Sequence, residues 1–394
     1  MLSFDVKYFN AEHENMLKQS ILYSELKQLV DCGFKCDPME YLAYSCFVNQ
    51  SNTYAGFRNY SELCQFVNAQ LTMHGAYFDT TGSSLRSVRS KPKDVPNPQI
   101  EQAGVGVALA LMSRAAHVTH ADWTRIPESN RIKTLDFNLA VSRVGPIIVE
   151  AKGKIDDKVA SNTGFSEKVN HIKAKKEAQR PKSPGIPMYG IVTLIPNKFG
   201  TNSTCYLLDP DLPAGEEDWK KHKILTRLRY YASILGQISQ THLLGSLYTR
   251  IRDIEQSDDY MSLSGQPLLN RRGEPFEIPS SLFYSRSAFA NGWAFGEVLP
   301  LQENKYLFFG LDTNVMEYLI KPDFNDIIRL SMSGATVDVS PEGIVARIPK
   351  NWLRRGDQFS QEYDRTDVTR KEIRMGGTIQ RLTSGLMLGF VYPS

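Results

Sequence analysis

The chain lacks most features that mark a secreted, membrane-spanning or disulfide-stabilised protein. Its five cysteines, an odd number scattered over part of a 394-residue chain, are typical of reduced thiols rather than of a disulfide framework. No apolar run is long enough to span a bilayer, and the first residues lack the basic-then-apolar pattern of a secretory signal. We therefore expect an intracellular protein without a membrane partner.

Several common catalytic signatures are also missing. The sequence contains no Walker A motif, no G-x-S-x-G nucleophile elbow and no H-E-x-x-H zinc motif. Cys32 and Cys36 have no second pair of ligands at zinc-finger spacing. The net charge is only +3, so a surface for nucleic acid must come from local clusters of charge rather than from the whole molecule.

What the chain does contain is enough apolar material for folded cores. Hydrophobic residues make up 41% and aromatic residues 10% of the sequence, and the length favours two or three domains, or one core with large additions. Periodicity and turn residues predict an α+β protein. Its predicted parts are a helical N-terminal region (1–80), a linker (81–97), a core (98–210), a helical segment (211–262) and a β-rich C-terminal region (263–394).

Residues 134–154, TLDFNLAVSRVGPIIVEAKGK, carry the strongest chemical signal. From Leu135 to Val141 apolar and polar side chains alternate, which predicts a half-buried strand with Asp136 on its polar face. The segment from Arg143 to Pro146 contains the Gly-Pro pair of a turn. The β-branched run 147–149 then predicts a second strand, so the segment as a whole is expected to form a hairpin.

The predicted hairpin brings two carboxylates and a lysine together. Glu150 and Lys152 share a face of the second strand, and a turn near Arg143 sets Asp136 opposite Glu150, give or take one pair. Opposed Cβ atoms lie about 4.5–5.5 Å apart, so the two acids could share one Mg²⁺ or Mn²⁺ ion. Lys152 would add a positive charge at a scissile phosphate or, with a lowered pKa, help to deprotonate the attacking water.

An upstream helix is predicted to supply a further acid. The Ala- and Leu-rich run that opens at Pro98 places Glu101 in its first turn, where the helix dipole favours negative charge. A short strand at 118–123, the hairpin, a second helix and a strand at 191–196 follow. The predicted order of elements is α-β-β-β-α-β.

With this order and these residues, the chain resembles the PD-(D/E)XK nuclease superfamily, which includes restriction enzymes, recombination exonucleases and defence nucleases. The resemblance covers roughly residues 98–200 and implies a restriction-endonuclease-like core. Asp136, Glu150 and Lys152 match the motif, although Leu135 stands where the motif name has proline. Glu101 matches the helical acid that often precedes the motif. The resemblance implies metal ligation by Asp136, Glu150 and Glu101, with Lys152 as a further catalytic residue.

The second predicted helix is rich in lysine. Phe165, Val169 and Ile172 recur at helical spacing and predict its buried stripe, so lysines on its other faces could follow a phosphate backbone. Some subfamilies carry a glutamine and a tyrosine on this helix, whereas here the glutamine is followed by Arg180 and Pro181. The residues predicted to contact nucleic acid are Lys168, Lys173, Lys175, Lys176 and Gln179.

Together these observations predict a nuclease that depends on Mg²⁺ or Mn²⁺, with a DNA endonuclease favoured over an enzyme acting on RNA. Enzymes that cut both strands at symmetric sites are often dimers, so a homodimer is a further expectation. Two alternatives stay open. The hairpin could be an ordinary one with a solvated Glu-Lys face, or the chain could be a structural, assembly or nucleic-acid-binding protein that keeps the fold without turnover.

Overall fold

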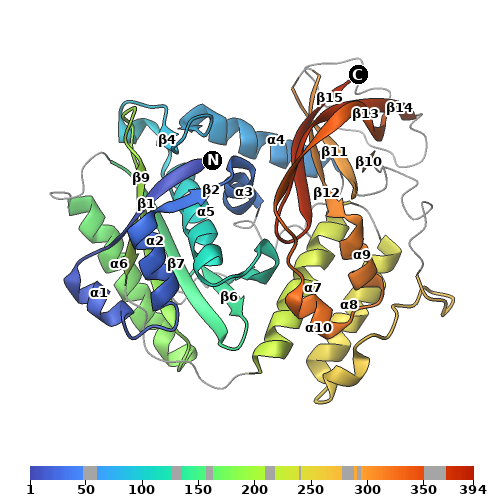
Figure 1. The fold of residues 1–394 in the computed structure, drawn as a ribbon, viewed down its shortest axis with the longest axis horizontal. Coiled ribbons are helices and arrows are strands. Elements are labelled where there is room, and N and C mark those ends of the chain that lie inside the picture. The colour runs from blue at the N-terminus through green and yellow to red at the C-terminus, as the bar shows by residue number, and fades with distance from the viewer. Residues whose placement is uncertain are drawn as a thin grey trace. The chain divides into compact units, whose positions relative to one another are not determined.

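The computed structural model describes residues 1–47, 60–126, 135–156, 163–208, 218–238, 241–276, 288–290, 294–302, 304–349 and 370–394. Helices and strands are mixed along the chain, which confirms the predicted α+β class (Figure 1). The chain divides into two compact units, Met1–Asn52 with Gln70–Thr226 and Thr53–Ala69 with Arg227–Ser394. The boundary therefore falls inside two helices, rather than at the domain limits predicted from composition.

A seven-stranded mixed sheet forms the centre of the first unit, in the order β2-β1-β9-β8-β7-β6-β5. Neighbouring strands are antiparallel except for the parallel pairs β1–β9 and β7–β8. The strands are β1 (Leu2–Tyr8), β2 (Phe34–Cys36), β5 (Trp123–Arg125), β6 (Phe137–Val141), β7 (Gly145–Ile155), β8 (Met188–Ile195) and β9 (Ser203–Leu208). A separate short pair joins β3 (Phe78–Asp79) and β4 (Arg86–Ser87).

Helices α5 and α6 cover opposite faces of this sheet. On β8, Val192 and Leu194 belong to a buried cluster with α6, whereas the intervening Thr193 donates a hydrogen bond to the Gly104 carbonyl of α5. The stripe predicted for α6 is confirmed, since Phe165, Val169 and Ile172 are all buried in that cluster. The helices of the unit are α1 (Ala11–Leu17), α2 (Tyr23–Cys32), α3 (Pro38–Leu42), α5 (Asn97–Ala115) and α6 (Thr163–Gln179), with α4 (Tyr60–Tyr77) shared with the second unit.

Strand β7 is much longer than its neighbour β6, so the second half of β7 lies beyond the β6 ladder. The β6–β7 ladder runs from Val141–Gly145 to Phe137–Val149. On the other side, β7 remains paired with β8 as far as Ile155. The second half of β7, from Glu150 onwards, therefore extends beyond the β6 ladder, and side chains from other elements can approach it there.

The N-terminal region, predicted as helical, holds α1 to α4 but also contains strands. Leu2, Phe4 and Val6 alternate as buried residues along β1, and β1 pairs in parallel with β9, from Phe4–Ser203 onwards. The predicted core therefore includes an N-terminal strand. The element order α5-β5-β6-β7-α6-β8 agrees with the predicted order, although β5 begins at Trp123, where the predicted strand ended.

The second unit contains a closed barrel of strands, in the order β10-β11-β12-β15-β14-β13. This agrees with the β-rich C-terminal region predicted from 263 onwards, and α7 and α8 occupy the predicted helical segment 211–262. The elements are α7 (Trp219–Gln237), which begins in the first unit, α8 (Thr241–Gln256), β10 (Ala288–Ala290), β11 (Ala294–Gln302), β12 (Lys305–Asp312), α9 (Thr313–Ile320), α10 (Phe324–Arg329), β13 (Ala335–Pro349), β14 (Arg370–Arg381) and β15 (Leu386–Pro393). Within the described residues, no helix has the length and apolar character needed to cross a membrane.

Candidate functional site

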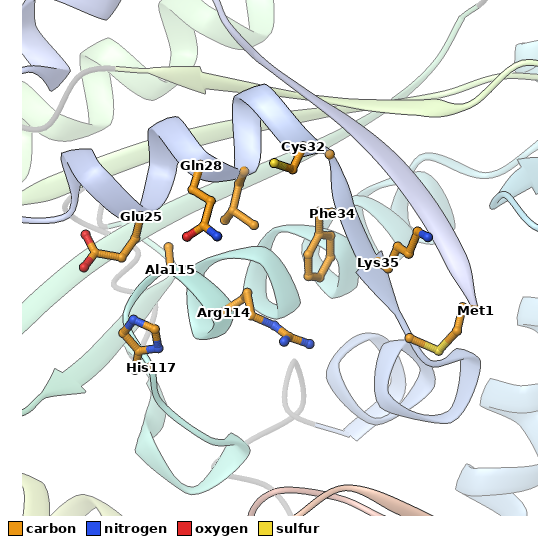
Figure 2. Close-up of a pocket in the computed structure, with 11 residues that line it drawn as sticks. Met1, Glu25, Gln28, Cys32, Phe34, Lys35, Arg114, Ala115 and His117 are labelled. Carbon is orange, nitrogen blue, oxygen red and sulfur yellow. The ribbon is translucent and has the colours of Figure 1, made fainter.

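A cavity of about 420 Å³ in the first unit is one candidate site (Figure 2). Its lining includes the cations Lys35 and Arg114, the imidazole of His117 and a single carboxylate, Glu25. Arg114 lies near the C-terminal end of α5, whereas Glu101 lies near its start, a separation of about 20 Å by the helical rise. The cavity is therefore distinct from the predicted acidic site, and none of the predicted site residues lines it.

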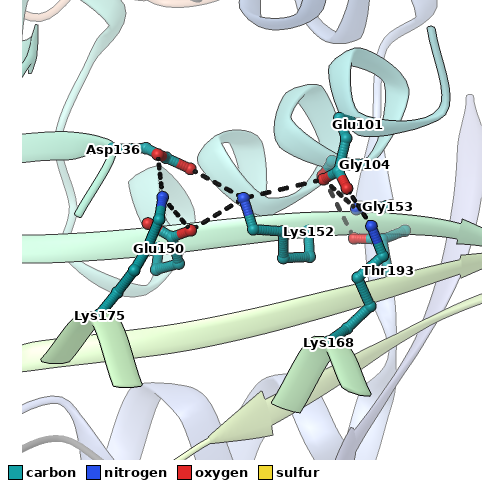
Figure 3. A network of polar contacts seen from close by, with 9 residues as sticks. All are labelled: Glu101, Gly104, Asp136, Glu150, Lys152, Gly153, Lys168, Lys175 and Thr193. Atoms are coloured by element: carbon teal, nitrogen blue, oxygen red, sulfur yellow. Dashed lines mark hydrogen bonds and ion pairs between the residues drawn. The ribbon is translucent and has the colours of Figure 1, made fainter. Parts of the chain in front are cut away.

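The four predicted catalytic residues come together beside the second half of β7, where it extends beyond the β6 ladder (Figure 3). Glu150 and Lys152 belong to β7, Asp136 lies directly before β6, and Glu101 lies near the start of α5. The ladder ends at Phe137 opposite Val149, so Asp136 and Glu150 are the next residues along the two strands, in line with the predicted placement to within one pair. Three segments that are distant in sequence thus supply one cluster of charged side chains.

The Lys152 ammonium lies at the centre of this cluster. Its Nζ atom is 2.9 Å from Glu150 Oε1, 3.6 Å from Asp136 Oδ2 and 4.0 Å from Glu101 Oε2. Burial alone would lower the pKa of Lys152, but the three carboxylates raise it above its ordinary value. In this arrangement the carboxylates keep Lys152 charged, which argues against a lysine base with a lowered pKa.

Glu150 is the most buried member of the cluster, with a side chain that is 0% exposed. Burial and the neighbouring charge of Asp136 raise its pKa to about 7, while Lys152 and Lys175 act in the opposite direction. Both of its carboxylate oxygens lack an aligned hydrogen bond, although the two ammonium groups lie at ion-pair distance. A buried carboxylate held only by cations, with a shifted pKa, is typical of functional sites.

Two lysines from α6 reach the same carboxylates. Lys175 Nζ is 2.9 Å from Asp136 Oδ1 and 2.7 Å from Glu150 Oε1, and Lys168 forms an ion pair with Glu101. Both residues were predicted to contact nucleic acid, and in the structure their ammonium groups face the acids instead. Nothing in the local sequence indicates this arrangement, because it depends on how α6 packs against the sheet.

The other residues of α6 that are predicted to contact nucleic acid differ in how exposed their side chains are. Lys173 is exposed. Lys176 and Gln179 are only 4% and 6% exposed and continue the buried stripe of the helix after Ile172. Gln179 donates a hydrogen bond to Ser183. The prediction that Lys176 and Gln179 contact nucleic acid is therefore wrong for the structure as it stands.

A close contact between two backbones allows Glu101 to reach β7. A Cβ atom on Gly153 would lie 2.0 Å from the Ile100 carbonyl oxygen, and one on Gly104 would lie 2.3 Å from Gly153 Cα. With α5 this close, Glu101 Oε2 accepts a hydrogen bond from the Gly153 N–H at 3.2 Å. A glycine inside a helical run and another directly after the E-x-K triplet are the sequence signals for this contact, and they were not used in the prediction.

The carboxylates fit a small, hard cation. In the part of the chain that the structure describes, no group of three or more Asp, Glu, His or Cys side chains is arranged to hold a metal ion. Asp136 and Glu150 nevertheless converge on one positive charge, the Lys175 ammonium. Mg²⁺ is commonly held by one or two carboxylates, with water and substrate phosphate oxygens completing its shell. This pair of acids matches that requirement, whereas Glu101 lies on the other side of Lys152 (Figure 3).

Comparisons with protein-family models, with curated proteins and with solved structures find no match for this chain. The chemistry of the cluster at the edge of β7 therefore has to support a functional assignment by itself.

Proposed function

We propose that this protein is a metal-dependent nuclease with a restriction-endonuclease-like core, and that it hydrolyses phosphodiester bonds in DNA. The observation that supports this most is the convergence of Asp136, Glu150 and Lys152 at the edge of β7, with Glu101 beside them. The order α5-β5-β6-β7-α6-β8 is a second support, because it is the order that the resemblance implies.

Asp136 and Glu150 would hold the divalent ion, Mg²⁺ or Mn²⁺. Such an ion neutralises charge on the phosphate and lowers the pKa of a bound water. Glu101 would act as a further ligand, directly or through water, and would also keep Lys152 in place across their 4.0 Å ion pair. Its hydrogen bond from the Gly153 N–H fixes the carboxylate against β7.

Lys152 would stabilise the negative charge that builds up on the phosphoryl oxygens. A pentavalent transition state carries more charge than its ground state, so a preorganised ammonium favours the transition state. The raised pKa of Lys152 keeps it charged at neutral pH. Lys168 and Lys175 on α6, together with the exposed Lys173, would add positive charge for the nucleic-acid backbone.

The proposal is tested by incubating the protein with plasmid DNA, single-stranded DNA and RNA, in Mg²⁺, in Mn²⁺ and in excess chelator. We expect metal-dependent cleavage of DNA that falls at least a hundredfold in Asp136→Asn and in Glu150→Gln. Both substitutions keep the side-chain shape and remove the charge. Cleavage that persists at the wild-type rate in both variants would contradict the assignment, as would an absence of cleavage of every substrate.

A protein that keeps this fold without turnover is the second candidate, and one observation favours it. Each carboxylate of the cluster is already paired with a lysine, so the cluster is neutralised without a metal. Thermal unfolding with and without Mn²⁺ separates the two functions, because a ligand that binds the native state stabilises it. If the protein is a metal-dependent nuclease, Mn²⁺ should raise the Tm of wild type and not that of Asp136→Asn. If it keeps the fold without turnover, Mn²⁺ should leave the Tm of both proteins unchanged.

A further inference from the structure

Lys175 has a position that the motif does not account for. It lies on α6, outside the D…E-x-K pattern, yet its Nζ atom is within 2.9 Å of Asp136 and 2.7 Å of Glu150. Lys152 is farther from Asp136, at 3.6 Å. Lys175 is therefore the cation that both proposed metal ligands approach most closely (Figure 3).

The ion pair between Lys175 and Glu150 is also largely buried. Lys175 is 13% exposed and Glu150 is 0% exposed, so water screens the attraction between the two charges less than it does at the surface. Lys175 also forms a hydrogen bond to Asp136 Oδ1. A divalent ion that takes both carboxylates as ligands would have to share this small space with the ammonium group, and two cations at such short range repel each other.

We infer that Lys175 acts as an internal counter-ion that occupies the cation position between Asp136 and Glu150, and that divalent metal binds by displacing it. The inference rests on the proposed function, because it takes these two acids as the metal ligands. It adds a regulatory element: the free site is held in a neutral form, and metal is taken up only as the Lys175 ammonium leaves the carboxylates.

The displaced ammonium has an obvious alternative partner. A phosphodiester carries a negative charge, and the Lys175 ammonium lies close to that of Lys152, since both are paired with Glu150 Oε1. The phosphates of a nucleic-acid backbone would give the released ammonium a negative charge to pair with, in place of the carboxylates that it leaves when metal binds. Metal and nucleic acid should therefore bind cooperatively, because each makes the change required by the other less costly.

The test is an equilibrium titration with Mn²⁺, with free Mn²⁺ measured by its paramagnetic resonance signal. The variant is Lys175→Met, which keeps most of the aliphatic chain and removes the charge. Lys154→Met is the matched control: Lys154 has a similar exposure of 17% and pairs with Asp156 at 3.5 Å, away from the proposed ligands. The control corrects for the general gain in cation affinity that follows from removing one positive charge nearby.

We expect Lys175→Met to lower the Kd for Mn²⁺ at least tenfold, Lys154→Met to change it less than threefold, and Asp136→Asn to abolish the gain when it is added to Lys175→Met. Lys175→Gln provides a second variant in case Lys175→Met does not fold, and it should also bind Mn²⁺ more tightly than wild type. Circular dichroism confirms that each variant is folded before it is titrated.

The possible outcomes separate the inference from the function on which it rests. If Lys175→Met binds Mn²⁺ as wild type does, or more weakly, the inference is overturned and the metal site itself stands. If the folded wild type and the folded Lys175 variants all fail to bind Mn²⁺, the proposed metal site is overturned, and the inference with it. If Lys154→Met gains as much as Lys175→Met, the effect is general electrostatics and the inference is again overturned.

Discussion

Replacing Gly153 by alanine should push α5 away from β7 and destabilise the first unit. The new Cβ atom would lie 2.0 Å from the Ile100 carbonyl oxygen and 3.2 Å from Gly104 Cα. Both contacts are with backbone atoms, which cannot swing aside as the tip of a side chain can. An ordinary contact is 3.4–4 Å, so the helix and the strand would have to separate by more than an ångström.

The cost can be estimated from overpacked cores. Forcing an extra methyl group into a well-packed interior costs about 1–3 kcal/mol. For a domain of roughly 150–250 residues, about 1 kcal/mol corresponds to about 2–4 °C in Tm. We therefore expect Gly153→Ala to lower the Tm of the first unit by about 2–12 °C, and Gly104→Ala to act in the same direction.

Thermal unfolding followed by circular dichroism measures this effect, and Gly75→Ala is the matched control. Gly75 lies in α4, and a Cβ atom there would meet nothing within 4 Å. Alanine is favoured over glycine in a helix by about 0.4–1 kcal/mol, so the Tm of this variant should stay the same or rise. A Gly153→Ala protein with the Tm of wild type, or a higher one, would refute the close contact that brings Glu101 to β7.

Two further predictions concern buried charge. Lys223→Met should destabilise the first unit by about 3–5 kcal/mol, because it removes the Lys223 ammonium that lies 3.2 Å from the buried Asp122 carboxylate, which is 0% exposed. Denaturant unfolding measures this. Lys27→Met, which removes an exposed pair with Asp31, should not change stability measurably. His120→Phe should reduce the stability that the first unit loses as the pH falls. Burial lowers the pKa of His120 to about 3, against about 6.5 when unfolded, so its contribution to stability is present above pH 6.5 and is lost as the pH falls towards 3. The variant keeps a ring to stack on Tyr44, and an unchanged loss of Tm between pH 7 and pH 5 would contradict this reasoning.

The local geometry of the candidate site was predictable from the sequence. Alternating apolar residues from Leu135 to Val141 and a Gly-Pro pair fix a hairpin and its register, because a slip of one residue would turn every apolar side chain outward. In the structure the ladder ends at Phe137 opposite Val149, so Asp136 and Glu150 are the next residues along the two strands. The buried stripe of α6 follows from helical periodicity, and the helix carrying Glu101 follows from its Ala- and Leu-rich composition.

What the sequence could not provide depends on contacts between distant segments. The pKa of Lys152 rises because tertiary packing adds Glu101 and Asp136 to the neighbouring Glu150. The inward direction of Lys175 depends on how α6 packs on the sheet. Strand β1 pairs with β9, a partner far along the chain, and strand formation of this kind depends more on such pairing than on local propensity.

The measurement that tests the proposed function most directly compares two lysines on one strand. Supercoiled plasmid is incubated in Mg²⁺ with wild-type protein, with Lys152→Ala and with Lys154→Ala. Lys152 lies among the three carboxylates, whereas Lys154 pairs with Asp156 away from them. We predict that wild type and Lys154→Ala nick the plasmid and that Lys152→Ala does not. Nicking by Lys152→Ala at the wild-type rate, or no nicking by the wild-type protein, would contradict the proposed nuclease.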